Sequence, residues 1–241
     1  MIRAIIVAIF LLFFFILSIP LFLIEWIIGK ININARHRST RWIVATAFKL
    51  ILFVAGVKIE VSGKENIPDE PCLFVGNHNG IFDVLVSYVA IGKVMGFISK
   101  KEIKKVPFLH LWMIFVNCLF IDRENIKEGL KTILQAAENI KNGISMFVFP
   151  EGTRSKDGKM IPFKEGSMKM AQRSNGIIVP VAITGTAQIF ERQFPRMKSG
   201  KVTIDFAKPF NMNELPKEEK KFVGAYTQNI IQEMLDKREQ V

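Results

Sequence analysis

Three histidines, His37, His78 and His110, are the side chains that titrate near neutral pH without a perturbed environment. His110 lies in an apolar run, where a histidine usually packs as a core residue, and we set it aside. His78 follows the apolar run 73–75 and precedes Asp83 by five residues. With His78 on a turn and Asp83 in the first turn of a helix, the carboxylate would hold the imidazole Nδ1–H while Nε2 accepts a proton. An Asp83 that only caps the helix, beside an exposed His78, fits the spacing equally well.

Two arginines follow other strand-like runs. Arg154 stands in the segment FPEGTRS at residues 149–155, and Arg123 ends the segment FIDR at residues 120–123. An arginine fork beside the exposed N–H groups of a glycine-containing turn suits a phosphate. Each arginine taken alone is better explained as a solvated or ion-paired surface residue, as most arginines are. Because parallel strands bring their carboxyl ends to one edge, the edge expected to carry His78, the phosphate interpretation gains weight.

Other reactive residue types give weaker indications. The basic segment KKEIKK at residues 100–105 reaches the same edge, a membrane or an acidic partner, or it forms a solvated helix face. Cys72 and Cys118 lie in or beside apolar runs with no adjacent base, which indicates buried, inert thiols. The chain contains no His-Glu-x-x-His pattern, Gly-x-Ser-x-Gly elbow or Walker loop. These patterns favour direct transfer over a covalent enzyme intermediate and give a metal site little support.

The elements that must position these residues are short strand-like runs alternating with helical patterns after residue 57. Residues 126–141 carry an apolar stripe at helical spacing, and a last amphipathic helix is expected over residues 217–237. The alternation predicts an α/β domain over residues 58–241, with a mostly parallel central sheet flanked by helices. We expect strands near residues 58–61, 73–75, 95–98, 119–122, 145–149, 177–183 and 202–206.

The first 57 residues are apolar and are expected to form a two-helix membrane-binding segment. Residues 4–24 carry no charge, and as a helix they would extend roughly 31 Å, at about 1.5 Å per residue, which is enough to cross a bilayer core. Residues 42–57 contain a lysine and favour an interfacial or re-entrant helix. Between them, the segment RHRSTR at residues 36–41 is expected to be a basic loop on the cytoplasmic side.

The flanks of the first apolar stretch help to define its nature. Arg3 precedes the stretch, and Trp26 and Lys30 follow it, as expected at the headgroup level of an anchor. A cleaved signal peptide has an apolar region of only about 7 to 15 residues, so the segment is expected to be retained. A spanning helix and one that enters a single leaflet both fit this pattern and keep the rest of the chain cytoplasmic.

Composition supports a membrane protein of one catalytic domain. The 241 residues are 49% hydrophobic, which excludes a disordered chain, and two cysteines exclude a secreted disulfide scaffold. The formal charge is +11 and the mean hydropathy is +0.25. A membrane surface suits a chain that is both basic and apolar, whereas no nucleic-acid-binding motif is recognisable.

Four ordered segments resemble the sequence blocks of the glycerolipid acyltransferase family. His78 with Asp83 is similar to the His-x4-Asp block, and residues 119–123, 149–155 and 178–181 resemble the second, third and fourth blocks. The resemblance implies that His78 deprotonates the free hydroxyl of lysophosphatidic acid, which then attacks an acyl thioester to give phosphatidic acid. Asp83 would orient the imidazole.

The resemblance also implies roles for other residues and for partners. The donor would be acyl-acyl carrier protein or acyl-coenzyme A, used as a substrate at the cytoplasmic membrane, with no cofactor, metal or nucleic acid. Glycerol-3-phosphate, another lysophospholipid and an ornithine lipid are alternative acceptors, and a non-catalytic basic membrane-binding protein is the alternative outside enzymes. By block, Arg123 and Arg154 would bind the acceptor phosphate, Glu151, Gly152 and Thr153 would shape the acceptor site, Val179, Pro180 and Val181 would line apolar walls, and Lys105 is our own addition to the phosphate site.

Overall fold

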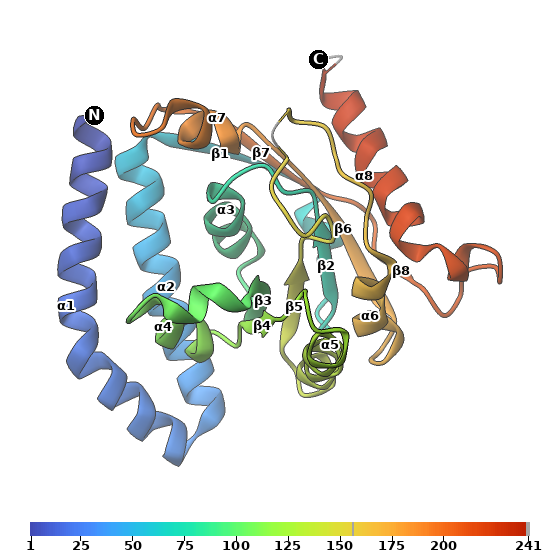
Figure 1. The fold of residues 1–241 in the computed structure, drawn as a ribbon, viewed down its shortest axis with the longest axis horizontal. Helices are drawn as coiled ribbons and strands as arrows, with labels where there is room; N and C mark the ends of the chain where they lie inside the picture. The colour runs from blue at the N-terminus through green and yellow to red at the C-terminus, as the bar shows by residue number, and fades with distance from the viewer. Residues whose placement is uncertain (156, 240–241) are drawn as a thin grey trace.

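The computed structural model describes residues 1–155 and 157–239 and shows a twisted mixed sheet covered by helices (Figure 1). Along the main path the strand order is β1-β7-β6-β2-β5-β3-β4, and β8 pairs with β6. The strands are β1 (Val57–Ser62), β2 (Leu73–Gly76), β3 (Met95–Lys100), β4 (Leu119–Ile121), β5 (Ser145–Val148), β6 (Ile177–Thr184), β7 (Gly200–Phe206) and β8 (Phe210–Asn211).

The mostly parallel sheet expected from the sequence is confirmed, because β2 pairs in parallel with both β5 and β6, β3 pairs in parallel with β5 and β4, and β1 with β7. The antiparallel pairs are β6 with β7 and β6 with β8. Each expected strand is present with its ends shifted by no more than two residues. The two-residue strand β8 was not expected, since so short a segment carries no periodic signal.

The central strands are buried on both faces, as parallel strands between helix layers require. In β2, Phe74 packs into one hydrophobic core while Leu73 and Val75 pack into the other. The first core lies under α2 (Ile33–Ala55), α3 (Phe82–Ile91), α4 (Leu109–Phe115) and α7 (Thr186–Ile189), and the second under α5 (Ile126–Lys141), α6 (Lys169–Gln172) and α8 (Val223–Glu239).

Five short 3-10 helices lie between the main elements of the described residues, and one of them accounts for the shifted start of α8. They are η1 (Lys64–Asn66), η2 (Lys101–Lys105), η3 (Glu165–Met168), η4 (Glu191–Gln193) and η5 (Glu219–Lys221). The helix expected over residues 126–141 is confirmed as α5, which Asn125 caps through its side-chain oxygen. The last helix begins at Val223 rather than at residue 217, because η5 occupies the preceding residues and Phe222 leaves helical geometry.

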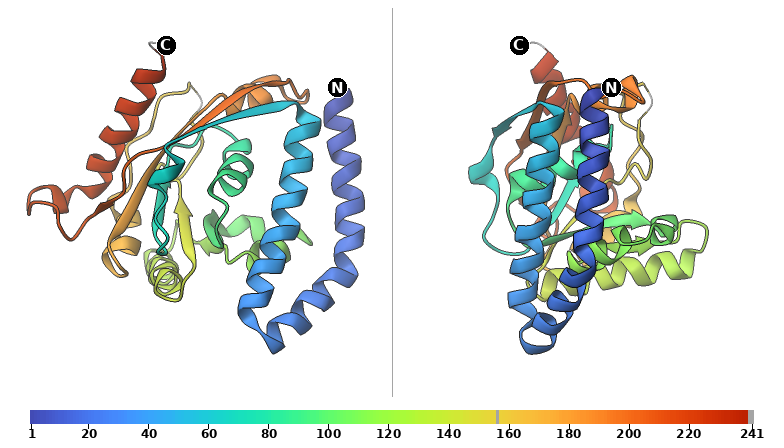
Figure 2. Two further views of the ribbon diagram at one scale, coloured as in Figure 1. Left: turned by 180° about the vertical axis from the view of Figure 1, so that it is seen from behind. Right: turned by 90° about the vertical axis from the view of Figure 1, so that its left-hand side faces the viewer.

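The N-terminal segment is a helical hairpin in which α1 (Ile2–Ile31) and α2 pack together (Figure 2). The chain reverses at one residue, Asn32, whose side chain accepts a hydrogen bond from Ala35 N and so begins α2. The prediction of a basic loop at residues 36–41 is therefore wrong, since this segment forms the first turns of α2. Helix α2 ends at Gly56, which adopts a left-handed conformation (φ 72°) suited to glycine.

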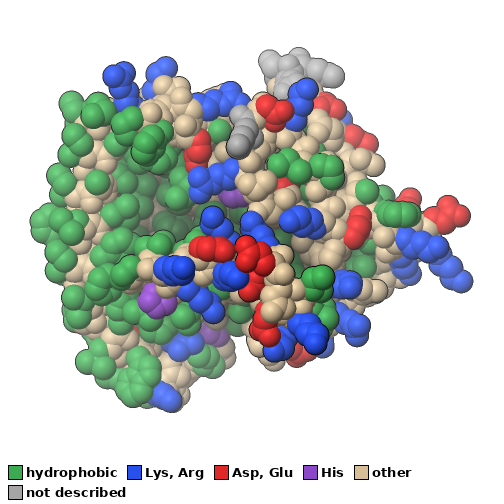
Figure 3. Space-filling model, viewed as in Figure 1, with side chains coloured by type: hydrophobic (Ala, Val, Ile, Leu, Met, Phe, Trp, Pro, Cys, Tyr) green, Lys and Arg blue, Asp and Glu red, His purple; other side chains and the backbone are tan. Residues whose placement is uncertain are grey.

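Helix α1 is long and apolar enough to cross a membrane by length and composition, and little of it is buried within the protein. Its inner side packs on α4 as well as on α2. Phe14 and Phe22 contact Trp112, and the Trp112 indole Nε1–H donates a 2.7 Å hydrogen bond to Ser18 Oγ. On its other side α1 leaves a continuous surface of apolar side chains (Figure 3).

Candidate active site

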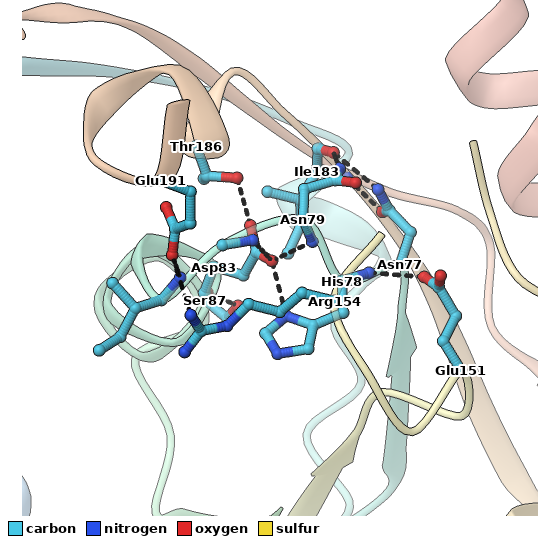
Figure 4. A network of polar contacts seen from close by, with 12 residues as sticks. Asn77, His78, Asn79, Asp83, Ser87, Glu151, Arg154, Ile183, Thr186 and Glu191 are labelled. Atoms are coloured by element: carbon cyan, nitrogen blue, oxygen red, sulfur yellow. Dashed lines mark hydrogen bonds and ion pairs between the residues drawn. The ribbon is translucent and has the colours of Figure 1, made fainter. Parts of the chain in front are cut away.

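His78 and Asp83 meet where β2 gives way to α3. The strand ends at Gly76, the turn carries His78, and Asp83 occupies the first turn of α3, where it is fully buried. His78 Nδ1 lies 2.8 Å from Asp83 Oδ2 (Figure 4). Of the two arrangements that the spacing allows, the structure contains the one in which the carboxylate contacts the imidazole. With Nδ1–H donated to Asp83, Nε2 is left as the proton acceptor.

Asp83 is also the anchor of the whole turn. Its Oδ2 accepts hydrogen bonds from Asn79 N at 2.6 Å and from Gly80 N at 2.8 Å. Its Oδ1 accepts one from the hydroxyl of Thr186, which lies after β6. A buried carboxylate is costly unless donors replace the water it has lost, and these contacts supply them.

The adjoining Asn77 and Glu151 hold the turn to the sheet. The Asn77 amide donates to Ile183 O and accepts from Ile183 N, both at 2.8 Å, and so continues the pairing of β2 with β6 after the backbone has left the sheet. Glu151 Oε1 accepts from His78 N at 2.7 Å, and Oε2 accepts from Ile161 N at 2.9 Å. Burial raises the pKa of Glu151. Through its two hydrogen bonds, the Glu151 carboxyl group holds the backbone of the site in place.

A cavity of about 750 Å³ opens beside His78. Its apolar wall comes from the helices of the first core and from β3, and the His78 ring stacks on Phe149 with ring centroids 4.1 Å apart. Lys and Arg side chains surround the hollow on the surface (Figure 3). The apolar lining includes Val44, Phe48, Leu85, Tyr88, Phe97, Met113 and Val116, and the cationic lining consists of Lys100, Arg123, Arg154 and Arg192.

The arginines of this cationic rim differ in their surroundings. Arg154 Nη1 lies 3.3 Å from Glu191 Oε1, which also accepts a 2.5 Å hydrogen bond from Ile81 N at the start of α3. Arg123 is exposed at the rim, where partial desolvation lowers its pKa. The guanidinium stays charged because the ordinary pKa of arginine is very high. The neighbouring Asp122 turns instead to Lys101, with Nζ and Oδ2 2.8 Å apart.

The structure brings some of the predicted site residues together and leaves others apart. Gly152 and Thr153 line the cavity with Arg123 and Arg154, whereas Glu151 reaches it only through the backbone of His78. Lys105 is exposed on η2 and is not among the lining residues, although Lys100 of the same basic segment is. Val179, Pro180 and Val181 are buried within β6 and do not line the cavity.

The remaining candidates lie outside the site. Burial raises the pKa of Cys72 and of Cys118 to about 12, and both thiols lie in the core. His110 is partly buried on α4, with Nδ1 3.1 Å from Val106 O. Within the described residues no group of three or more His, Cys, Asp and Glu side chains has the arrangement of a metal site.

Two residues of the site, Thr186 and Glu191, carry no signal in the sequence. Each follows β6 and contacts the turn that carries His78 only because β6 and β2 are neighbours in the sheet.

The assembled site can do three things. It can accept a proton at His78 Nε2, attract an anionic group at the cationic rim, and hold an apolar chain in the cavity.

Comparison with known proteins places these features in context. The sequence model described as Acyltransferase matches residues 58–184, more than half of the chain. Three relatives are named 1-acyl-sn-glycerol-3-phosphate acyltransferase. The Saccharomyces cerevisiae protein is 28% identical over 83% of this chain and 67% of its own length. The Borreliella burgdorferi protein is 32% identical over 59% of this chain and 57% of its own, and the chloroplastic Brassica napus protein BAT2 is 32% identical over 64% and 45%.

The chain thus matches less than two thirds of the length of the last two relatives. A solved structure covers almost the whole chain. The crystal structure of the LPA acyltransferase PlsC from Thermotoga maritima superposes with a TM-score of 0.80 over 99% of this chain and 97% of that one, at 24% identity. At this identity the likeness shows a common fold, including the two N-terminal helices.

Proposed function

Because the chain belongs to the acyltransferase family, we propose that it transfers a fatty acyl group from a thioester to the sn-2 hydroxyl of 1-acyl-glycerol-3-phosphate. The observation that carries this proposal is the His78–Asp83 pair, with Nδ1 and Oδ2 2.8 Å apart, at a cavity with an apolar wall and a cationic rim. The acceptor has the matching chemistry of a hydroxyl, a phosphate and an apolar tail. The names of the sequence relatives describe acyl transfer to the same acceptor.

The reaction proceeds by direct transfer between the two substrates. His78 Nε2 removes the proton of the acceptor hydroxyl while Asp83 holds Nδ1–H and supports the imidazolium that forms. The hydroxyl oxygen attacks the thioester carbonyl, and the tetrahedral intermediate collapses as the C–S bond breaks. The departing thiolate takes the proton from His78, so the base is restored and phosphatidic acid leaves.

The cationic rim binds the phosphate of the acceptor. Arg123 and Arg154 offer planar forks that match phosphate oxygens, and Lys100 adds a point charge. Gly152 and Thr153 form the turn beside them, with Gly152 in a left-handed conformation (φ 74°). The apolar wall of the cavity then receives an acyl chain.

The hairpin attaches the protein to the bilayer in which the acceptor resides. Because α1 is tied to α4 through Trp112 and to α2 along its length, an α1 that crossed the membrane would draw α2, and α4 of the catalytic domain, into hydrocarbon. We therefore place the hairpin in one leaflet of the cytoplasmic membrane, with the site on the cytoplasmic side. The +11 charge attracts the acidic acyl carrier protein or the phosphates of coenzyme A.

The test is transfer activity of the purified full-length protein in detergent. Lysophosphatidic acid is supplied with acyl-coenzyme A or acyl-acyl carrier protein, and phosphatidic acid and released thiol are measured for the parent, His78→Ala and His110→Ala. We expect His78→Ala to lose about 10² to 10⁴-fold of the activity, the usual share of general acid–base catalysis. His110→Ala should behave like the parent, because His110 does not line the cavity.

Unchanged turnover by His78→Ala would reject His78 as the base. A parent that is silent with both donors, yet acylates glycerol-3-phosphate, another lysophospholipid or an ornithine lipid, would change the acceptor. A folded parent that is silent with every acceptor, yet still binds vesicles, would favour the non-catalytic membrane protein.

A further inference from the structure

The carboxylate of Asp83 receives its hydrogen bonds unevenly. His78 Nδ1, Asn79 N and Gly80 N all contact Oδ2 and all come from the turn next to α3. The contact to Oδ1 comes from a distant part of the chain, the hydroxyl of Thr186 in the first turn of α7 (Figure 4). Both side chains are completely buried.

Thr186 reaches this position because of the corner that follows β6. The preceding Gly185 adopts a left-handed conformation (φ 85°), and a Cβ atom there would lie 2.4 Å from Lys201 O of β7. Only glycine permits so close an approach to the neighbouring strand. The corner therefore directs the chain straight from β6 into α7, with the Thr186 hydroxyl against Asp83.

Hydrogen bonds set how readily a buried carboxylate takes up a proton. A donor to the anion favours the anion, so the loss of the Thr186 hydroxyl would leave Oδ1 desolvated and favour proton uptake by the His78–Asp83 pair. The other charged groups that face the pair across the cavity are Lys100, Arg123, Arg154, Glu191 and Arg192. Glu151 binds His78 N from the loop after β5. Their contacts among the described residues do not include Oδ1, so Thr186 is the natural control point.

We propose that Thr186 is a positioning residue that acts through Asp83 to keep the His78–Asp83 pair in its proton-accepting form. This inference rests on the proposed function, in which the unprotonated pair is the active one. Thr186 touches neither the acceptor nor the thioester in this scheme. Its effect is on the pH at which the base becomes available.

The experiment is the pH profile of kcat/KM for Thr186→Val, Thr186→Ser and the control Thr227→Val. Valine keeps the shape of threonine without the hydroxyl, and serine keeps the hydroxyl. Thr227 is an equally buried threonine whose hydroxyl donates to Val223 O within α8, on the opposite face of the sheet. We expect the acid limb of Thr186→Val to move up by about one pH unit, with about a tenfold loss of kcat/KM below the limb and parent-like values well above it.

Thr186→Ser should restore the position of the limb, and Thr227→Val should leave it in place. The position of the limb does not depend on the fraction of folded enzyme, so partial loss of fold in a variant does not hide the result. If valine fails to fold altogether, Thr186→Ala removes the same hydroxyl from a smaller side chain. A limb that stays at the parent position in the valine or alanine variant would overturn the proposal for Thr186.

Failure of this inference is distinguishable from failure of the proposed function. A parent that makes phosphatidic acid and loses this activity in His78→Ala, together with an unmoved limb in Thr186→Val, would refute only the role of Thr186. A parent and His78→Ala of equal activity would refute the base itself.

Discussion

The outer face of α1 exposes apolar side chains, whereas the turn around His78 buries polar ones. On α1, side chains such as Leu12, Leu17 and Leu23 are about 60% exposed although they are apolar. At the turn, Asn77, Asp83 and Thr186 are polar, although they are almost completely buried. Each region reverses the usual distribution of side chains in a globular protein.

The difference lies in where the partners come from. The buried polar groups of the turn find donors and acceptors within the chain, and this fixes the geometry of the site before any substrate arrives. The apolar face of α1 has no such cover among the described residues, and in the proposed function a lipid bilayer covers it. Under that proposal the two regions suit an amphiphilic acceptor, whose headgroup is recognised by charge and whose tail remains with the membrane.

Arg154→Ala should have the largest effect on the polar region around His78. The substitution removes a guanidinium from the cationic rim, so KM for lysophosphatidic acid should rise about 10- to 100-fold while KM for the acyl donor stays near the parent value. Steady-state kinetics with each substrate varied in turn would measure the two effects. Arg173→Ala, which changes an exposed arginine at the end of α6, is the matched control. Equal increases for both substrates would contradict a role in recognising the acceptor.

Leu17→Glu should disturb the apolar outer face of α1. It places a charge in the middle of the outer face of α1, so binding to vesicles that contain anionic lipid should weaken by about tenfold. Co-sedimentation with vesicles measures this effect. Ile126→Glu is the control, because Ile126 is 88% exposed on α5, on the other face of the sheet. If both variants bind alike, α1 is not the membrane contact.

The smallest effect is expected from modification of the two cysteines, which lie in the core. Because burial raises the pKa of Cys72 and of Cys118 to about 12, the thiolate form is negligible at pH 8, and a thiol reagent should not react with the native protein. Both thiols should react after denaturation. If a thiol of the native protein reacts quickly and its modification abolishes transfer activity, the direct-transfer mechanism would be contradicted in favour of a covalent acyl–enzyme intermediate.

The elements with strong local patterns were predictable from the sequence. The apolar stripe and Asn125 cap define α5, and apolar runs bounded by polar turns define β2, β5 and β6. The sequence-based turn lies too late, because the arginine-containing segment 36–41 resembles a loop, whereas it forms early turns of α2 after the Asn32 cap. A charged run therefore does not by itself mark the end of a helix.

The candidate site could be predicted only in part, because some of its contacts are local in sequence and others join distant residues. His78 and Asp83 are close in sequence, so the contact between them is a matter of local geometry. The contacts of Thr186 with Asp83 and of Asn77 with Ile183 bridge more than a hundred residues and depend on the order of strands in the sheet. Spacing along the chain carries no information about such pairs.

The hydrogen bond from Gly80 N to Asp83 also bears on the chemical durability of one dipeptide of the site. In an Asn-Gly pair such as Asn79-Gly80, the glycine nitrogen readily attacks the asparagine amide and forms a cyclic imide, which opens to aspartate or isoaspartate. Here that nitrogen donates to Oδ2 at 2.8 Å, and the Asn79 amide is held 3.4 Å from Ile183 O. The native fold thus protects a dipeptide that ages quickly in an unfolded chain, and the groups that build the site also preserve it.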